Sequence, residues 1–220
     1  MTTVYGAPLS PFVRKVLMAL EIKNISYELE HVAPGAIPEG YDTLHPLRKI
    51  PSFKDDLITL CDSSVICDYL ENRYPDASIY PKDLVLRAKA LWLEEYADSK
   101  IIAVLGRPVF YKRVVTKGMM GQEIDEVQIE RHIETEVPPV FDYLESQTPE
   151  AGYLIGDSLS IADISVVSHF INAGYAGLKV DVSRWPLLSS YIERMLDEKP
   201  FQVRLEQDTK VLSRLLKNSS

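Results

Sequence analysis

In the first eighty residues, hydrophobic positions recur first at the spacing of a strand and then at that of a helix, and this alternation repeats. The pattern predicts six elements, in the order strand, helix, strand, strand, strand, helix: Thr2–Tyr5, Pro11–Ile22, Ile25–Val32, Ile50–Phe53, Leu57–Leu60 and Ser64–Arg73. Lys54, Asp55 and Asp56 separate the last two strands, which indicates a hairpin. This β-α-β, β-β-α order is typical of a small α/β layer with a mixed sheet.

Beyond the proline-containing segment Pro75–Asp83, the hydrophobic pattern has only the helical period. It predicts five helices: Val85–Leu105, Ile124–Glu145, Ser160–Ala173, Leu187–Leu196 and Phe201–Leu216. The stretch Arg107–Gln122 carries no recognisable motif and is expected to form loops. We therefore expect an α/β domain at residues 1–77, a linker at 78–84 and an all-α domain at 85–220.

The predicted helix Ser160–Ala173 differs from the others because apolar residues surround it on nearly all sides. Ser160 and Asp163 have the spacing of a capping box, in which the Asp163 carboxylate reaches back to the Ser160 amide. Leu159 and Ile164 occupy the positions of a hydrophobic staple. We expect this helix to be the buried centre of the second domain, and its residues to hold the fold rather than to react.

The charge is evenly divided along the chain. Its net value is −8, with 7 basic and 11 acidic side chains in residues 1–80 and 17 and 21 in the remainder, so each part carries −4. Neither part offers a basic surface, so nucleic acids and anionic membranes are not expected partners. The longest uncharged stretch, Ile164–Leu178, has 15 residues and is short for a membrane span.

Cysteine and histidine usage indicates a cytoplasmic protein without a metal. Cys61 and Cys67 are the only cysteines, and their spacing is that of neither a redox pair nor a zinc knuckle. The N-terminus has no basic residue before Arg14 and does not read as a secretory signal. The four histidines show no metal-ligand spacing: His31, His45, His132 and His169.

Ser10 and Pro11 lie where the first strand passes into the first helix. Serine at the N-cap followed by proline at the first helical position is a start signal that local structure alone explains. The alternative is functional: an anion, or a thiol that ionises, binds at this helix N-terminus beside the Ser10 hydroxyl.

Two further positions carry the same ambiguity. Pro51 opens a predicted strand, where proline is tolerated, and nothing local requires a cis Ile50–Pro51 bond. Asp62 and Ser63 precede a helix and suit an N-cap, but a carboxylate and a hydroxyl together can also hold the amino and carboxylate groups of a ligand.

Four motifs, in order and spacing, make the sequence resemble the cytosolic glutathione transferase family over essentially its whole length. They are Val4–Val16 (VYGAPLSPFVRKV), Lys49–Phe53 (KIPSF), Asp62–Ser63 and Gly156–Asp163 (GDSLSIAD). The resemblance implies a thioredoxin-like N-terminal domain that binds glutathione as co-substrate, an all-α C-terminal domain that supplies most of the electrophile pocket, a role in detoxification, and a homodimer.

The resemblance also assigns roles to individual residues. It implies a cis Ile50–Pro51 bond that offers backbone groups to the cysteinyl part of glutathione. Asp62 and Ser63 fall where the γ-glutamyl end is held, and Lys49 where the ligand backbone or its glycyl carboxylate is contacted.

Members of the family differ in the group that meets the glutathione sulfur. Ser10 is similar in place to the serine of the theta-like, phi-like and tau-like classes, and Tyr5 to the catalytic tyrosine of others. No cysteine lies nearby, which counts against the cysteine classes. We favour Ser10 and keep Tyr5 as its competitor, although tyrosine is also a common strand residue.

The small hydrophobic electrophile has six candidate contacts in the sequence. Two flank Ser10 and four lie in the second domain: Leu9, Phe12, Tyr96, Leu105, Phe110 and Tyr111. Aromatic residues at helical spacing are more often core than ligand contacts, so both interpretations stay open.

Two other functions compete with glutathione conjugation. One is a binding or regulatory protein that keeps the fold and has no transferase turnover. The other is a glutathione-dependent isomerase similar to the zeta-like members, although the Ser10–Arg14 run departs from their Ser-Ser-Cys arrangement.

Overall fold

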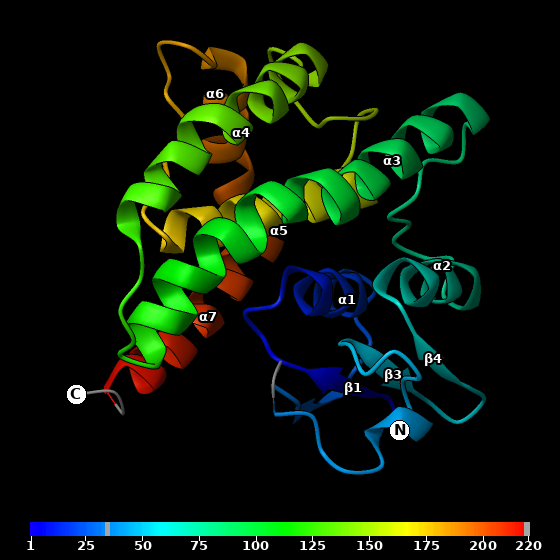
Figure 1. The fold of residues 1–220 in the computed structure, drawn as a ribbon. Coiled ribbons are helices and arrows are strands. Elements are labelled where there is room, and N and C mark those ends of the chain that lie inside the picture. Colours follow the sequence, from blue (N-terminus) through cyan, green and yellow to red (C-terminus); the bar gives the residue numbers. More distant parts are fainter. Residues whose placement is uncertain (34–35, 218–220) are drawn as a thin grey trace. The chain divides into compact units, whose positions relative to one another are not determined.

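The computed structural model describes residues 1–33 and 36–217, which form two compact units, Met1–Tyr80 and a second unit that begins at Pro81. The first is α/β and the second is helical (Figure 1). This is the fold class that the hydrophobic periods predict.

The first unit is built on a four-stranded mixed sheet with strand order β2-β1-β3-β4. Strands β1 (Thr3–Gly6) and β2 (Glu28–His31) are parallel, with α1 (Pro11–Ile22) between them in the chain. Strand β3 (Ser52–Lys54) is antiparallel to β1 and to β4 (Thr59–Cys61), so the predicted hairpin is confirmed. The sequence did not reveal a short 3₁₀ helix, η1, at Tyr41–Thr43.

Helices α1 and α2 (Ser63–Arg73) pack on one face of this sheet. Val4 and Phe53 pair across β1 and β3 and are fully buried, and the Phe53 ring meets Tyr69 of α2 edge to face at 5.8 Å. A Cβ atom on Gly6 would lie 2.4 Å from Cγ2 of Val13, so only glycine permits α1 to approach β1 this closely.

The opposite face of the sheet carries a row of polar side chains. Register places Glu30, Tyr5, Ser52 and Cys61 side by side on β2, β1, β3 and β4. Side chains of paired residues project to the same face, and successive residues to opposite faces. Tyr5 therefore points away from the face that carries α1, and the buried Ser52 Oγ lies 2.9 Å from Oη of Tyr41.

Three ion pairs tie α2 to the rest of this unit. Arg73 pairs with Asp55 at 2.9 Å and with Asp56 at 2.8 Å in the β3–β4 connection. The buried Lys23 ammonium lies 2.7 Å from Glu71 and also donates to the Tyr74 carbonyl. These pairs connect the C-terminal end of α2 to the end of α1 and to the β3–β4 connection.

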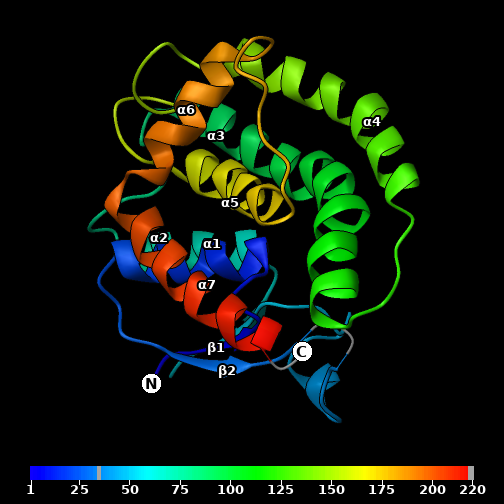
Figure 2. The same cartoon turned by 90° about the vertical axis from the view of Figure 1, so that its left-hand side faces the viewer.

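The second unit is helical throughout its regular elements. In chain order they are α3 (Leu84–Tyr96), η2 (Ala97–Met119), α4 (Glu126–Gln147), α5 (Ile161–Tyr175), α6 (Pro186–Leu196) and α7 (Lys199–Lys217). Figure 2 shows α5 in the middle, among α3, α4 and α6. All thirteen side chains from Ile161 to Ala173 are buried, as the apolar pattern of this helix predicts.

The expectation of loops at Arg107–Gln122 is wrong, because η2 continues the helical rod with π-type turns as far as Met119. Pro108 lies inside it and has no amide hydrogen to donate along the helix. Nε2 of His132, on α4, lies 2.9 Å from the Val104 carbonyl oxygen, and because a carbonyl only accepts, the ring donates. A residue 28 positions away in sequence thus gives η2 a hydrogen bond from another helix.

The predicted capping box at the start of α5 is present. Asp163 accepts hydrogen bonds from the Ser160 amide at 2.9 Å and from the Ser160 hydroxyl at 2.9 Å. It also accepts from the Leu154 amide and from Oη of Tyr191, both at 2.8 Å. Burial raises the pKa of Asp163, while these four donors act in the opposite direction.

Candidate functional site

Ser10 caps α1 with its side chain. Its half-buried hydroxyl oxygen accepts from the Val13 amide at 3.5 Å, and its carbonyl accepts from the Arg14 amide at 2.9 Å. Accepting at the oxygen leaves the hydroxyl hydrogen able to donate to another atom. Ser10 can therefore cap the helix and bind an anion at the same time.

Tyr5 occupies a different setting. It is half-buried on β1, and burial, followed by the charge of Glu30, raises the pKa of its hydroxyl. A phenol in this setting stays protonated. Tyr41 reaches Ser52 on the same sheet face, opposite α1.

Asp62 adopts a strained backbone conformation at the start of α2. Its φ is +77° and its ψ is 126°, and its Oδ1 accepts from the amides of Ser64 at 3.0 Å and Val65 at 3.2 Å. A non-glycine residue held in such a conformation costs about 1–3 kcal/mol and is often found at ligand sites. The Asp62 side chain is exposed, whereas Ser63, the first residue of α2, is buried. The N-cap interpretation is thus seen in the structure, and it leaves the ligand interpretation open.

A tight turn leads from η1 to the Ile50–Pro51 bond, which is cis. The Arg48 amide donates to the His45 carbonyl at 2.8 Å, and Arg48 has a φ of +51°. Lys49 follows with an exposed side chain, and Pro51 is buried. The turn therefore positions the Lys49 side chain and the Ile50 backbone.

His45 is a residue of this region that the sequence did not single out. It is buried, and its pKa is lowered by burial first and then by the charge of Lys49, while Asp62 acts to raise it. The charges of these two predicted ligand contacts thus act on the pKa of His45 in opposite directions. No sequence signal pointed to His45, because a lone histidine before a proline has no motif.

The apolar candidates differ in burial. Leu9 is buried beside Ser10 and Phe12 is half-buried on α1. In the second unit, the Tyr96 ring lies with its centroid 4.6 Å from that of Tyr143 of α4, at an interplanar angle of 51°, and Leu105 is buried.

Phe110 packs against the buried cluster of Val109, Val114 and Ala176. Tyr111 is half-buried. Tyr96, Leu105 and Phe110 thus have contacts that core packing explains, and Phe12 and Tyr111 have more accessible surface.

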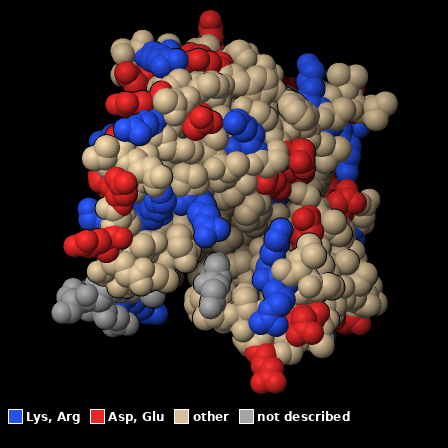
Figure 3. Space-filling model, viewed as in Figure 1, with Lys and Arg blue, Asp and Glu red and all other residues tan. Residues whose placement is uncertain are grey.

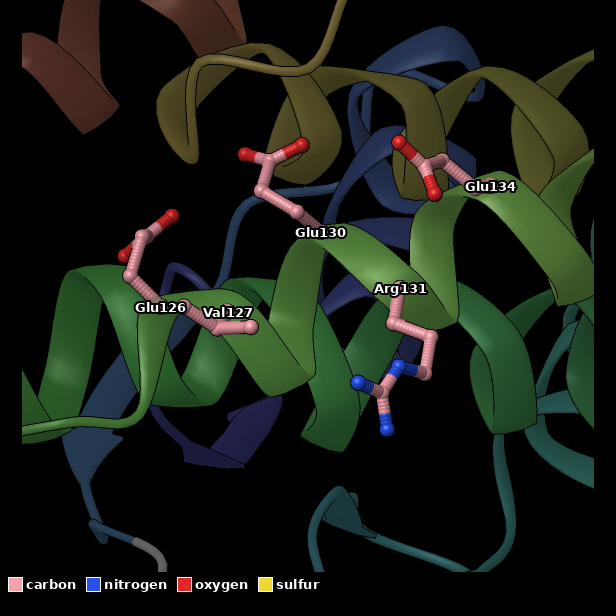
Figure 4. A pocket seen from close by; sticks show the side chains of 5 residues that line it. All are labelled: Glu126, Val127, Glu130, Arg131 and Glu134. Carbon is pink, nitrogen blue, oxygen red and sulfur yellow. The ribbon is translucent and has the colours of Figure 1, made fainter.

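A shallow hollow on α4 contains none of the predicted site residues. It is lined by Glu126, Val127, Glu130, Arg131 and Glu134, and Figure 4 shows the three glutamates projecting from one side of the helix and Arg131 from the other. Arg113 of η2 pairs with both Glu126 and Glu130. We assign no ligand to this hollow.

On the face seen in Figure 3, basic and acidic side chains are interspersed over both units. Among residues 1–33 and 36–217, no three His, Cys, Asp or Glu side chains are grouped as metal ligands would be. None of the described helices combines the length and the apolar composition that crossing a membrane requires.

Family models match both units. Residues 4–78 match the glutathione S-transferase N-terminal domain, and residues 114–202 match the glutathione S-transferase C-terminal domain. A glutathione S-transferase of Triticum aestivum is 26% identical over 93% of each chain. A maleylacetoacetate isomerase of Mus musculus is 30% identical over 89% of each chain.

Solved structures agree with these matches. A glutathione S-transferase of Rhodospirillum rubrum superposes with a TM-score of 0.82 at 27% identity, covering 93% of this chain and 92% of the other. A glutathione transferase homologue of Drosophila mojavensis, solved with bound glutathione, superposes with a TM-score of 0.78 at 25% identity, covering 99% and 97%. With both domain models matched and relatives that span nearly the whole chain, this protein belongs to the cytosolic glutathione S-transferase family.

Proposed function

We propose that this protein is a glutathione transferase in which Ser10 stabilises the glutathione thiolate for attack on an apolar electrophile. The observation that carries the proposal is the half-buried Ser10 hydroxyl at the N-cap of α1, with a hydrogen left to donate. The positive end of the helix dipole lies at the same place and also favours an anion.

The energetics of the thiol explain why such a donor matters. A free thiol titrates near pH ~8.5, so only a few per cent is thiolate at neutral pH. A hydrogen bond to a charged group contributes about 1.5–3 kcal/mol, which lowers a thiol pKa by about one to two units. One serine therefore raises the thiolate fraction at pH 7 severalfold to more than tenfold.

The position of Tyr5 supports the choice of Ser10. The Tyr5 side chain points to the sheet face that carries Ser52 and Cys61, opposite the face on which α1 packs. Ser10 lies at the end of α1 itself, where the dipole adds to the hydrogen bond.

The remaining ligand contacts follow the family resemblance. We propose that Asp62 and Ser63 hold the γ-glutamyl end, that the Ile50 and Pro51 backbone meets the cysteinyl part, and that Lys49 pairs with the glycyl carboxylate. The strained conformation of Asp62 and the exposed Lys49 ammonium support these roles. Each unit carries net negative charge. The positive potential that attracts the two carboxylates of glutathione must therefore come from such local groups.

The chemical step is a substitution or an addition at carbon. The thiolate sulfur donates its electron pair to an electrophilic carbon, a C–S bond forms, and with an aryl halide the halide leaves with the electrons of its bond. Within the first unit, we propose that Leu9 and Phe12, which flank Ser10, contact the electrophile.

Replacing Ser10 by alanine tests the proposal. We expect kcat/KM for 1-chloro-2,4-dinitrobenzene at pH 6.5 to fall about 10- to 100-fold, and the thiol pKa in the pH profile to rise by about one to two units. The loss in kcat/KM should be far smaller in Tyr5→Phe. Ser26→Ala, at an exposed serine in the same unit, should keep the wild-type kcat/KM. An unchanged rate and profile in Ser10→Ala would refute the assignment and promote Tyr5.

A glutathione-dependent isomerase is the second candidate, favoured by the name of the mouse relative. Turnover of maleylacetoacetate without conjugation of aryl halides would select it. Retention on immobilised glutathione with neither activity would instead indicate a binding or regulatory protein.

A homodimer in the cytoplasm completes the proposal. Four large apolar side chains on α3 are exposed to solvent: Leu84, Val85, Leu91 and Trp92. Their spacing puts them on one stripe, which a second copy would cover. Light scattering on the wild type and on Leu91→Glu tests this, since a mass of one chain for both would exclude the dimer.

A further inference from the structure

The turn that follows η1 is held by the imidazole of His45. The Arg48 amide donates to the His45 carbonyl at 2.8 Å, which closes a four-residue turn with Pro46 and Leu47 at its centre. The Leu47 amide donates to Nδ1 of His45 at 3.3 Å. The side chain thus binds the amide two residues ahead, as an asparagine does in an Asx-turn.

His45 is enclosed on several sides. It is 4% exposed, and its ring stacks on that of Tyr41 with centroids 6.5 Å apart. The charged groups that act on it are Lys49, in the same loop, and Asp62, at the start of α2. The stacked Tyr41 also holds Ser52 of β3, so the ring is anchored to the sheet.

Resting on the function proposed above, we propose that His45 is a positioning residue for glutathione, and that only its neutral imidazole holds the turn that presents Lys49 and the Ile50 backbone. A neutral ring accepts the Leu47 amide at Nδ1, whereas a protonated ring has hydrogens on both nitrogens and cannot accept. Acid therefore releases the turn, and glutathione binding weakens as the pH falls through the pKa of His45.

Charge alone would predict the opposite effect of acid on glutathione binding. A protonated His45 would add a positive charge near a ligand with two carboxylates, which would strengthen binding in acid. Its burial and its proximity to Lys49 both oppose that charge. The sign of the pH dependence therefore separates positioning from simple attraction.

The test uses S-methylglutathione, a thioether whose binding does not report on thiol ionisation. Its carboxylates stay ionised and its amino group protonated between about pH 5 and 7. Calorimetric titration across this range compares the wild type with His45→Asn, whose side-chain oxygen accepts the Leu47 amide at every pH, and with His45→Ala, which cannot. His31→Asn, at an exposed histidine of the same unit, is the matched control.

We expect wild-type affinity to be constant near pH 7 and to fall towards tenfold per pH unit below the pKa of His45. His45→Asn should keep the neutral-pH affinity with no such fall, and His45→Ala should bind about three- to tenfold more weakly throughout. Imidazole NMR of the wild type supplies a readout that needs no folded variant: saturating ligand must lower the pKa of the His45 resonance, by reciprocity.

Identical pH profiles for the wild type and His45→Asn, stronger binding in acid, or a ligand-insensitive His45 pKa would each overturn the proposal while leaving the transferase function in place. A wild type that binds no S-methylglutathione at any pH would instead overturn the proposed function, and this proposal with it.

Discussion

The two units of the molecule place their polar side chains differently. In the first unit the residues proposed to act, such as Ser10, Asp62 and Lys49, lie at the ends of elements with half-buried or exposed side chains. In the second unit the most heavily bonded carboxylate, Asp163, is fully buried in the central helix. A motif can therefore be equally recognisable in sequence and serve ligand binding in one unit and stability in the other.

The carboxylate pKa values show the same contrast. In the first unit burial acts to raise the pKa values of Asp55 and Glu71, but hydrogen bonds and the nearby Arg73 and Lys23 lower both overall. In the second unit burial prevails and the pKa of Asp163 is raised. Ion pairs at the end of α2 support the first unit, and a network of neutral donors around the buried Asp163 supports the second.

The largest effect is expected from Asp163→Ala. It leaves the Leu154 and Ser160 amides and two hydroxyls without their acceptor inside the protein, which should cost about 3–5 kcal/mol. Urea unfolding followed by tryptophan fluorescence measures this unit alone, because Trp92 and Trp185 both lie in it. Asp157→Ala, at an exposed loop position, is the control, and a loss below about 1 kcal/mol in Asp163→Ala would contradict the central role of this carboxylate.

Glu71→Gln makes the corresponding change in the first unit. It removes the charge that faces the buried Lys23, which keeps its bonds to two carbonyls, so we expect a loss of about 2–3 kcal/mol. Hydrogen exchange should accelerate in peptides from residues 1–80 and stay unchanged in the second unit. Asp76→Asn, at an exposed position nearby, should leave the exchange rates of both units unchanged. Faster exchange in both units of Glu71→Gln would show that the two units unfold together.

Tyr191→Phe sharpens the account of the Asp163 network. It removes one of four donors and leaves the fold otherwise intact, so the free energy of unfolding should fall by about 1.5 kcal/mol. Tyr153→Phe, which loses a half-buried bond to Glu198, should cost less. Equal losses in the two variants would indicate that burial adds nothing to the Tyr191 bond.

The smallest effect on stability is expected from replacing Asp55, and it appears only in acid. Because the pKa of Asp55 is lower in the folded chain than the ordinary value near 3.8, its contribution is present above that pH and is lost as the pH falls below it. Between about pH 4 and 2.5, the free energy of unfolding should fall by under 1 kcal/mol less in Asp55→Asn than in the wild type. Thermal unfolding by circular dichroism measures it, and an unchanged slope would remove Asp55 from the acid response.

Local spacing was enough to predict most helices and strands and three of the caps. Ser10 and Asp62 accept from amides no more than three residues away, and the Ser160 amide donates to the Asp163 carboxylate three residues ahead, so short motifs contain the whole interaction. The failure at Arg107–Gln122 has the opposite cause. Pro108 argues locally against a helix, whereas a hydrogen bond to the Val104 carbonyl of η2 comes from His132, which is distant in sequence.

The periodicity and caps of this chain thus followed from the sequence, because backbone geometry brings residues a few positions apart together in any context. Tertiary structure alone decided which groups from distant segments meet. It places Tyr191 against Asp163, turns Tyr5 away from the α1 face, and lets the charge of Asp62 act on His45. Such meetings depend on how the whole chain packs, and they set burial and charge proximity, from which the altered pKa values follow.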